Sequence, residues 1–116
     1  MSSEKSLFIP LISEYWYAFR DGTKTEELRL YGARWNENTC RIGRKAILSK
    51  GYGKAHRIPA IVADFHKRDA RTFGSTTQAN ILRIFGTLDK PIAQIKFKDF
   101  DRANYPIPEE TPTAKE

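Results

Sequence analysis

The succession of short apolar runs constrains the fold of this chain more than any other feature of its sequence. Five runs have the composition of strands and cover Leu7–Pro10, Glu26–Tyr31, Lys45–Ser49, Ile58–Phe65 and Pro91–Phe100. Two others have apolar residues at helical spacing and a glycine just after them, and they cover Ser13–Asp21 and Thr76–Phe85. This order predicts an α+β fold, built as a small β-barrel or strongly bent sheet with two short helices.

Length and composition limit the chain to one small folded domain. Its 116 residues, of which 40% are hydrophobic, are enough to bury a modest core. No apolar run approaches the roughly 20 residues needed to span a bilayer, and the N-terminus lacks the pattern of a signal peptide. We therefore expect a cytoplasmic protein that does not act at a membrane.

The cysteine and the histidines do not predict a metal centre. Cys40 is the single cysteine, which excludes an internal disulfide and a cysteine-based zinc site, and we interpret it as a small buried residue. His56 and His66 have no second ligand at metal spacing. We therefore predict neither a metal nor a cofactor, and we interpret both histidines as surface or loop residues.

The net charge of +6 is unevenly distributed along the chain. In residues 101–116 two basic residues stand against four acidic ones, which leaves +8 on the remaining hundred residues. Between Glu37 and Asp64 there is no acidic residue at all. Six basic residues fall in this basic segment: Arg41, Arg44, Lys45, Lys50, Lys54 and Arg57. Such a run is typical of a solvated face, but the missing acids and the interleaved Tyr52 favour a polyanionic partner, above all nucleic acid.

Charged residues also gather at the start of the second predicted strand. Since successive side chains of a strand point to opposite faces, Leu28 and Leu30 should share one face and Glu27 and Arg29 the other. If the leucines face the core, the carboxylate and the guanidinium line a polar surface beside Lys24. This arrangement would suit a binding site on a rigid element, and the alternative is a structural ion-pair cluster.

The loop that follows this strand contains an arginine beside a tryptophan, Arg34 and Trp35. A tryptophan in a polar loop either covers the core as a lid or offers a platform on which a base stacks. The neighbouring arginine favours an anionic or planar ligand, so both interpretations stay open.

The residues Gly22-x-Lys24-x-x-Glu27-x-Arg29 resemble the G-x-K-x-x-E-x-R signature of the ASCH domain, which belongs to the PUA-like superfamily. The order of elements is also similar: a short strand and helix precede the signature, and a hairpin and a long apolar strand follow it. The resemblance covers roughly residues 6–100 as one ASCH/PUA-like domain. Residues 101–116 are left as a C-terminal tail rich in proline and glutamate.

The resemblance implies a small PUA-like β-barrel with a cleft lined by the signature residues, which receives RNA or a modified nucleoside. The predicted partner is accordingly RNA or a nucleoside or nucleotide, and the sequence leaves the oligomeric state open. With the basic segment and the arginine–tryptophan loop added, the candidate ligand-binding residues are Lys24, Glu27, Arg29, Arg34, Trp35, Lys50, Tyr52, Lys54 and Arg57.

Some ASCH-like proteins are enzymes, and this gives an alternative function. Relatives that deacetylate acetylcytidine carry a threonine where Glu27 stands and a further glutamate after the barrel, whereas residues 64–86 here contain no glutamate. Others are reported to cleave RNA with a lysine, a tyrosine and a serine, for which Lys24, Tyr52 and Ser49 are the candidates. The sequence therefore favours an RNA- or nucleotide-binding module. The alternative is a hydrolase in which Lys24 and Glu27 are the catalytic residues.

Overall fold

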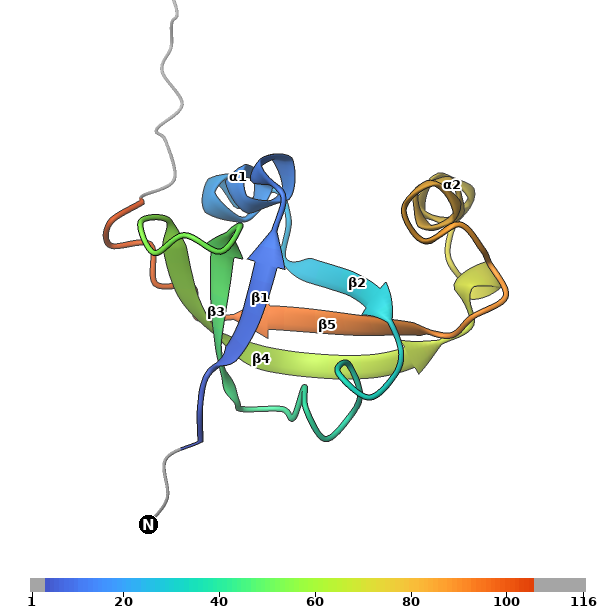
Figure 1. The fold of residues 1–116 in the computed structure, drawn as a ribbon, viewed down its shortest axis with the longest axis horizontal. Helices are drawn as coiled ribbons and strands as arrows, with labels where there is room; N and C mark the ends of the chain where they lie inside the picture. The colour runs from blue at the N-terminus through green and yellow to red at the C-terminus, as the bar shows by residue number, and fades with distance from the viewer. Residues whose placement is uncertain (1–3, 106–116) are drawn as a thin grey trace, which may run out of the picture.

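A computed structural model describes residues 4–105 of the chain, so the part of the predicted tail beyond Tyr105 lies outside the described residues. All seven predicted elements are present within this range (Figure 1). They are β1 (Leu7–Leu11), α1 (Ser13–Asp21), β2 (Glu26–Leu30), β3 (Lys45–Lys50), β4 (Arg57–Arg68), α2 (Ser75–Phe85) and β5 (Ile92–Lys98). A single 3-10 turn, η1 (Ala70–Thr72), connects β4 to α2.

The five strands form one sheet in the order β1-β3-β4-β5-β2. The β1–β3 pair is parallel and the other pairs are antiparallel. The sheet curls into a half-barrel whose edge strands within residues 4–105 are β1 and β2 (Figure 1). This confirms the α+β class and the strongly bent sheet. The predicted β-barrel is present only as a half-barrel, because within residues 4–105 the sheet order leaves β1 and β2 as two separate edges.

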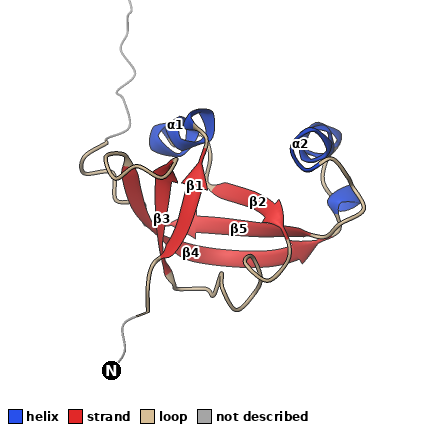
Figure 2. Cartoon of the chain, in the orientation of Figure 1, coloured by secondary structure: helices blue, strands red, loops and turns tan. Residues whose placement is uncertain are grey.

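The main core fills the inside of the curled sheet, and α1 covers one end of it (Figure 2). Trp16 and Phe19 of α1 are completely buried there, and the indole Nε1 of Trp16 donates a hydrogen bond of 3.1 Å to the Leu48 carbonyl. Cys40 is also fully buried in this core, and burial raises the pKa of its thiol. The interpretation of Cys40 as a small buried residue is therefore correct.

A second, smaller cluster lies on the opposite face of the sheet under α2. Its fully or nearly buried members are Ala70, Phe73, Ile81 and Ile92. In α2 the buried residue is Ile81, whereas Leu82 remains 50% exposed. Phe85 also packs on this cluster, and Gln78 donates hydrogen bonds to the Arg71 and Phe73 carbonyls. Figure 2 shows the helix at the far end of the sheet from α1.

The alternation predicted for β2 is present, but its two faces meet different surroundings. Residues directly opposite on paired strands share a face, and Glu27 lies opposite Ile95 of the main core. Leu28 and Leu30 instead pack against the smaller cluster under α2. The side of β2 that carries Glu27 therefore faces the inside of the half-barrel. Its leucines face the smaller apolar cluster on the other face of the sheet.

Residues 101–105 contact the body of the domain. The guanidinium of Arg102 donates hydrogen bonds of 2.8 and 3.2 Å to the Phe19 carbonyl, and Tyr105 packs partly buried against the main core. Neither of the two α-helices within residues 4–105 combines the length and apolar character needed to cross a membrane.

Candidate functional site

A cleft of about 430 Å³ lies between the start of α1 and the side of α2, with β2 as one wall. It contains the three charged residues of the signature. Its lining residues are Pro10, Leu11, Ile12, Tyr15, Lys24, Glu26, Glu27, Leu28, Arg29, Thr77, Asn80, Ile81, Ile84 and Phe85. The cleft thus depends on how β1, β2 and both helices are placed around it (Figure 1).

Glu27 is the most buried charged residue of this cleft, with 6% of its surface exposed. One carboxylate oxygen lies 3.5 Å from the ammonium of Lys24, and the other accepts a hydrogen bond of 2.8 Å from Nε of Arg29. A buried carboxylate requires such partners, because an unpaired buried charge is costly. The two cations therefore hold Glu27 in one orientation on the wall of the cleft.

Arg29 is held by contacts on three sides. Besides its bond to Glu27, its Nη2 donates a hydrogen bond of 2.6 Å to the Pro10 carbonyl on β1. Its guanidinium carbon lies 4.7 Å from the centre of the Trp35 ring, a distance typical of cation–π contact. This arginine is consequently a rigid part of the cleft wall.

The turn after α1 places Lys24. Gly22 ends the helix in the left-handed conformation at φ 83°, and the backbone N–H groups of Thr23 and Lys24 both donate to the Ala18 carbonyl. The ammonium of Lys24 lies 5.1 Å from the centre of the Tyr15 ring. The left-handed turn at Gly22 therefore directs the chain so that Lys24 lies between the Tyr15 ring and Glu27.

Much of the remaining cleft surface is apolar. Ile12 is 60% exposed and Ile84 is 47% exposed, and they enter the cleft from the start of α1 and from α2. Thr77 and Asn80 add polar atoms from α2. A site with an apolar, aromatic wall and a few fixed charges can hold a planar ring and orient it by hydrogen bonds.

The residues of α2 and the start of α1 were not identified from the sequence as site residues. Tyr15 and Phe85 are indistinguishable from core aromatics in a helical pattern, and the exposed isoleucines have no motif. Their membership of the cleft follows from the tertiary position of α2. Only the charged residues Lys24, Glu27 and Arg29 had a sequence signal.

A second, shallower hollow of about 600 Å³ adjoins the cleft across the end of β1. Lys50 and Tyr52 from the basic segment line it, together with Pro10, Leu11, Ile12, Ser13, Arg29 and Gly51. Arg57 lies behind Tyr52, with its guanidinium 5.0 Å from the centre of the Phe8 ring, and Lys54 is exposed in the hairpin turn. The structure therefore places Lys50 and Tyr52 next to the cleft, whereas Lys54 and Arg57 line neither hollow.

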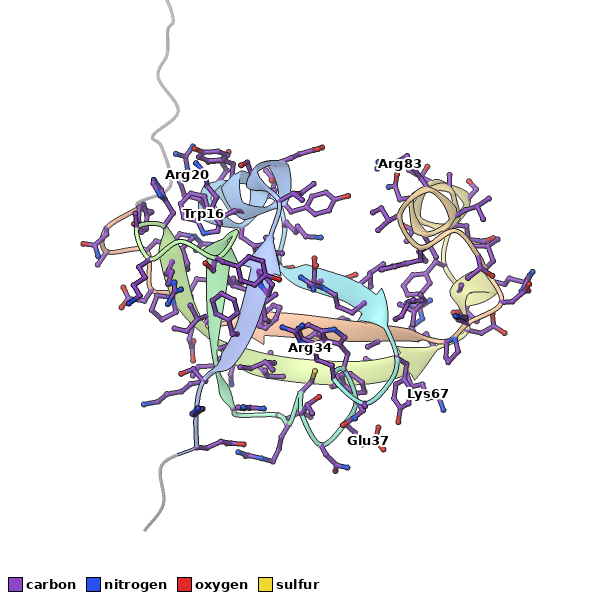
Figure 3. All side chains as sticks on the ribbon, viewed as in Figure 1. Trp16, Arg20, Arg34, Glu37, Lys67 and Arg83 are labelled. Atoms are coloured by element: carbon purple, nitrogen blue, oxygen red, sulfur yellow. The ribbon has the colours of Figure 1, made fainter. Side chains whose placement is uncertain are left out.

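Three predicted residues have other surroundings and line neither hollow. Ser49 is completely buried, and its hydroxyl donates to the Gly53 carbonyl at 3.3 Å, so it holds the hairpin turn and does not line the cleft. Trp35 is 8% exposed and belongs to the main core, so it acts as a lid. Arg34 is exposed beside that lid, 5.1 Å from the ring centre (Figure 3).

The Tyr31 hydroxyl and the Glu37 carboxylate form a hydrogen bond of 2.6 Å outside the cleft. Lys67 lies over the Tyr31 ring at 4.4 Å, and Figure 3 shows it and Glu37 on the same side of the molecule. The hydrogen bond from Tyr31 lowers the pKa of Glu37, and the same bond raises the pKa of the Tyr31 phenol.

Lys50 of the second hollow also contacts a tyrosine of α1. The ammonium of Lys50 donates a hydrogen bond of 2.9 Å to the Tyr17 hydroxyl, and Arg20 contacts the same ring (Figure 3). The hydrogen bond and the positive charge of Lys50 lower the pKa of the Tyr17 phenol. Within residues 4–105 no group of three or more His, Cys, Asp or Glu side chains is arranged to hold a metal ion.

Comparison with known proteins gives a structural match and no sequence match. No family model matches the chain, and none of the curated proteins matches it. The chain is similar to the crystal structure of a tyrosine-to-phenylalanine mutant of ZmASCH from Zymomonas mobilis, with a TM-score of 0.58 and 16% sequence identity. The match covers 89% of this chain and 85% of the other. The fold is therefore that of a small ASCH-type domain.

Proposed function

We propose that this chain is an RNA- or nucleotide-binding module that holds a nucleobase in the cleft beside Glu27. The module corresponds to residues 6–100, followed by the tail. The observation that carries the proposal is the buried carboxylate of Glu27, fixed between Lys24 and Arg29 on the wall of a cleft that is otherwise largely apolar. The ASCH-type fold supports the same proposal.

The chemistry of the cleft suits a base better than a phosphate. Glu27 accepts hydrogen bonds, and a carboxylate has sites for more than the two that Lys24 and Arg29 occupy. Lys24 supplies donors beside it. The edges of unpaired bases carry both donors and acceptors, and their faces stack on aromatic and apolar side chains such as Tyr15 and Ile84. A volume of about 430 Å³ lies within the range of small-ligand sites.

The basic segment, together with Arg34, supports binding of a polyanion around this cleft. Lys50 lines the adjoining hollow, Lys54 is exposed, and Arg34 is exposed beside Trp35. Lysines and arginines near a base-binding site contact the phosphates and release counterions. Affinity for single-stranded RNA should therefore fall steeply as the salt concentration rises.

Binding measurements with matched variants test the proposal. Fluorescence anisotropy with short single-stranded RNA, and calorimetry with nucleosides and nucleotides, should show binding at low salt. Glu27→Gln and Lys24→Met should each weaken it about ten-fold or more, because each removes a charged hydrogen-bonding group. Lys98→Met is the control, since it removes an exposed lysine that does not line the cleft. Absence of binding at low salt, or equal losses in all three variants, would contradict the proposal.

The alternative function is hydrolysis of a modified nucleoside or of RNA. Its specific support is the pairing of Lys24 with Glu27, which puts a proton donor and an acceptor in one cleft. The burial of Ser49 argues against its use as a nucleophile. Incubation with acetylcytidine and with RNA distinguishes the two functions. Turnover that Lys24→Met abolishes would identify an enzyme, whereas binding without turnover supports the module.

A further inference from the structure

We propose that the site extends over both hollows and holds two consecutive nucleotides of single-stranded RNA, with the side chain of Ile12 between their bases. This inference rests on the proposed function, because it specifies the ligand of the same site. One base would occupy the cleft beside Glu27, and the next would lie on Tyr52 in the shallower hollow.

The two hollows adjoin along one short segment of the chain. Both are lined by Pro10, Leu11 and Ile12 at the end of β1, and both include Arg29. Because four lining residues are shared, a chain that leaves the cleft over this segment enters the second hollow directly. A free nucleoside would fill the first hollow alone.

The charges of the two hollows differ in a way that matches a base and a backbone. In the cleft Lys24 and Arg29 are balanced by Glu26 and Glu27. In the second hollow Lys50 has no acidic side chain among the lining residues, whereas the charge of Arg29 is already paired with Glu27. A neutral base therefore suits the cleft, and the phosphate that follows it suits the second hollow.

The shallow hollow contains a stacking surface for a second base. Tyr52 is 75% exposed, and its ring lies 5.8 Å from that of Phe8, which in turn contacts the guanidinium of Arg57. This support from behind keeps an otherwise exposed ring in place. Exposed aromatic rings beside cations are the usual platforms on which unpaired bases stack.

The hairpin turn that presents Tyr52 is tied to β1. Gly51 has a left-handed backbone at φ 65°, and its N–H donates a hydrogen bond of 2.8 Å to the Leu11 carbonyl. This bond fixes the turn next to the segment that separates the hollows. The position of the Tyr52 ring is therefore set by the backbone of the turn as well as by the contacts of its own side chain.

Ile12 is suited to separate two bases. Its side chain is 60% exposed and lines both hollows, so it is accessible to a ligand in either of them. Its carbonyl accepts hydrogen bonds from the backbone N–H groups of Tyr15 and Trp16, so the first turn of α1 fixes its backbone. A rigid apolar side chain between the two hollows separates neighbouring bases, so that each base stacks on the protein and not on the other base.

The decisive experiment compares ligand lengths on the unaltered chain. Calorimetry should measure the affinity for each of the four nucleoside 5′-monophosphates and for the matching 5′-phosphorylated homodinucleotides. The best dinucleotide should bind about ten-fold or more tightly than its mononucleotide, because a second base adds a stacking contact. Tyr52→Ala should remove the ten-fold gain of the dinucleotide, and so weaken dinucleotide binding far more than mononucleotide binding. Tyr52→Phe should retain the gain.

Ile12→Ala provides a second test with its own control. It should weaken dinucleotide binding several-fold, whereas Ile42→Ala should not, since Ile42 is equally exposed at 59% but lines neither hollow. Equal affinities for mononucleotide and dinucleotide, or equal losses of both in Tyr52→Ala, would overturn the two-hollow site and leave the proposed function standing. Absence of binding by every nucleotide and by RNA would overturn the proposed function and this inference with it.

Discussion

Nη2 of Arg29 on β2 donates a hydrogen bond of 2.6 Å to the carbonyl oxygen of Pro10 on β1. These are the two edge strands of the half-barrel, so a side chain joins edges that the backbone ladder leaves apart. The same guanidinium holds the carboxylate of Glu27 at 2.8 Å. One side chain therefore links the two edges of the sheet and, together with Lys24, orients the carboxylate of the cleft.

We expect Arg29→Met to lower the free energy of unfolding by about 2–3 kcal/mol. The change removes a hydrogen bond to Pro10 and the ion pair of a buried carboxylate, and such charged groups are costly to leave without partners. Urea unfolding measures the effect. Arg83→Met is the control, because Arg83 is exposed on α2 (Figure 3), and it should change stability by less than about 0.5 kcal/mol. Equal losses in both variants would show that the bridge contributes nothing.

Gly22→Ala should destabilise the domain by about 1–2 kcal/mol, since Gly22 has φ 83° and a side chain is strained in that region. Because this turn places Lys24, nucleotide affinity should fall as well. Gly32→Ala is the matched control, since a Cβ there meets nothing within 4 Å and no positive φ is present. Thermal unfolding of the two variants checks the prediction, which fails if both are equally stable.

The phenol of Tyr17 should ionise at lower pH than an ordinary tyrosine, because the hydrogen bond and charge of Lys50 lower its pKa. Its contribution to stability is then fully present above the ordinary pKa of a phenol and is lost as the pH falls through the lowered pKa. NMR titration of ring-labelled tyrosine measures this, with Tyr17→Phe for assignment. Lys50→Met should return the pKa towards normal, and Lys54→Met should not.

The carboxyl of Glu37 should titrate below an ordinary glutamate, because Tyr31 donates a hydrogen bond to it and lowers its pKa. The stability that this bond contributes is present above the ordinary glutamate pKa and is lost as the pH falls through the lowered one. Tyr31→Phe should raise the pKa of Glu37 when it is followed by carboxyl NMR. An unchanged titration in that variant would mean that the bond does not persist in solution.

The sequence was a good guide to elements whose signals are local. The glycines after both helices, Gly22 and Gly86, are left-handed C-caps, and both helices end where those glycines predict. The sequence predicted the strand that begins at Ile58 but not its full length. β4 continues to Arg68, because its last residues pair with β5 although they are basic and have no strand pattern of their own. In α2 the partly buried Phe85 packs on the smaller cluster beside the buried Ile81, whereas Leu82 stays 50% exposed, because the position of that cluster decides which side of the helix docks.

The candidate site likewise combines features that near neighbours encode with features that depend on residues far apart in the chain. Local spacing was enough to select Lys24, Glu27 and Arg29, because a turn glycine and strand alternation act within eight residues. The sequence could not tell whether Trp35 was a lid or a platform, and it proposed Ser49 as a candidate, although both are buried. Burial depends on residues distant in the chain that pack around a position, and no short pattern encodes it.

The amino-acid sequence by itself determined the α+β class, the order of the elements and the charged residues of the signature, because periodicity and turn chemistry act between near neighbours. The tertiary structure decided that Glu27 faces the inside of the half-barrel and the leucines of β2 face α2. It also decided that α2 forms a wall of the cleft and that Arg29 reaches Pro10. These relationships join residues far apart in the chain, so they arise only when the sheet curls and its two edges approach.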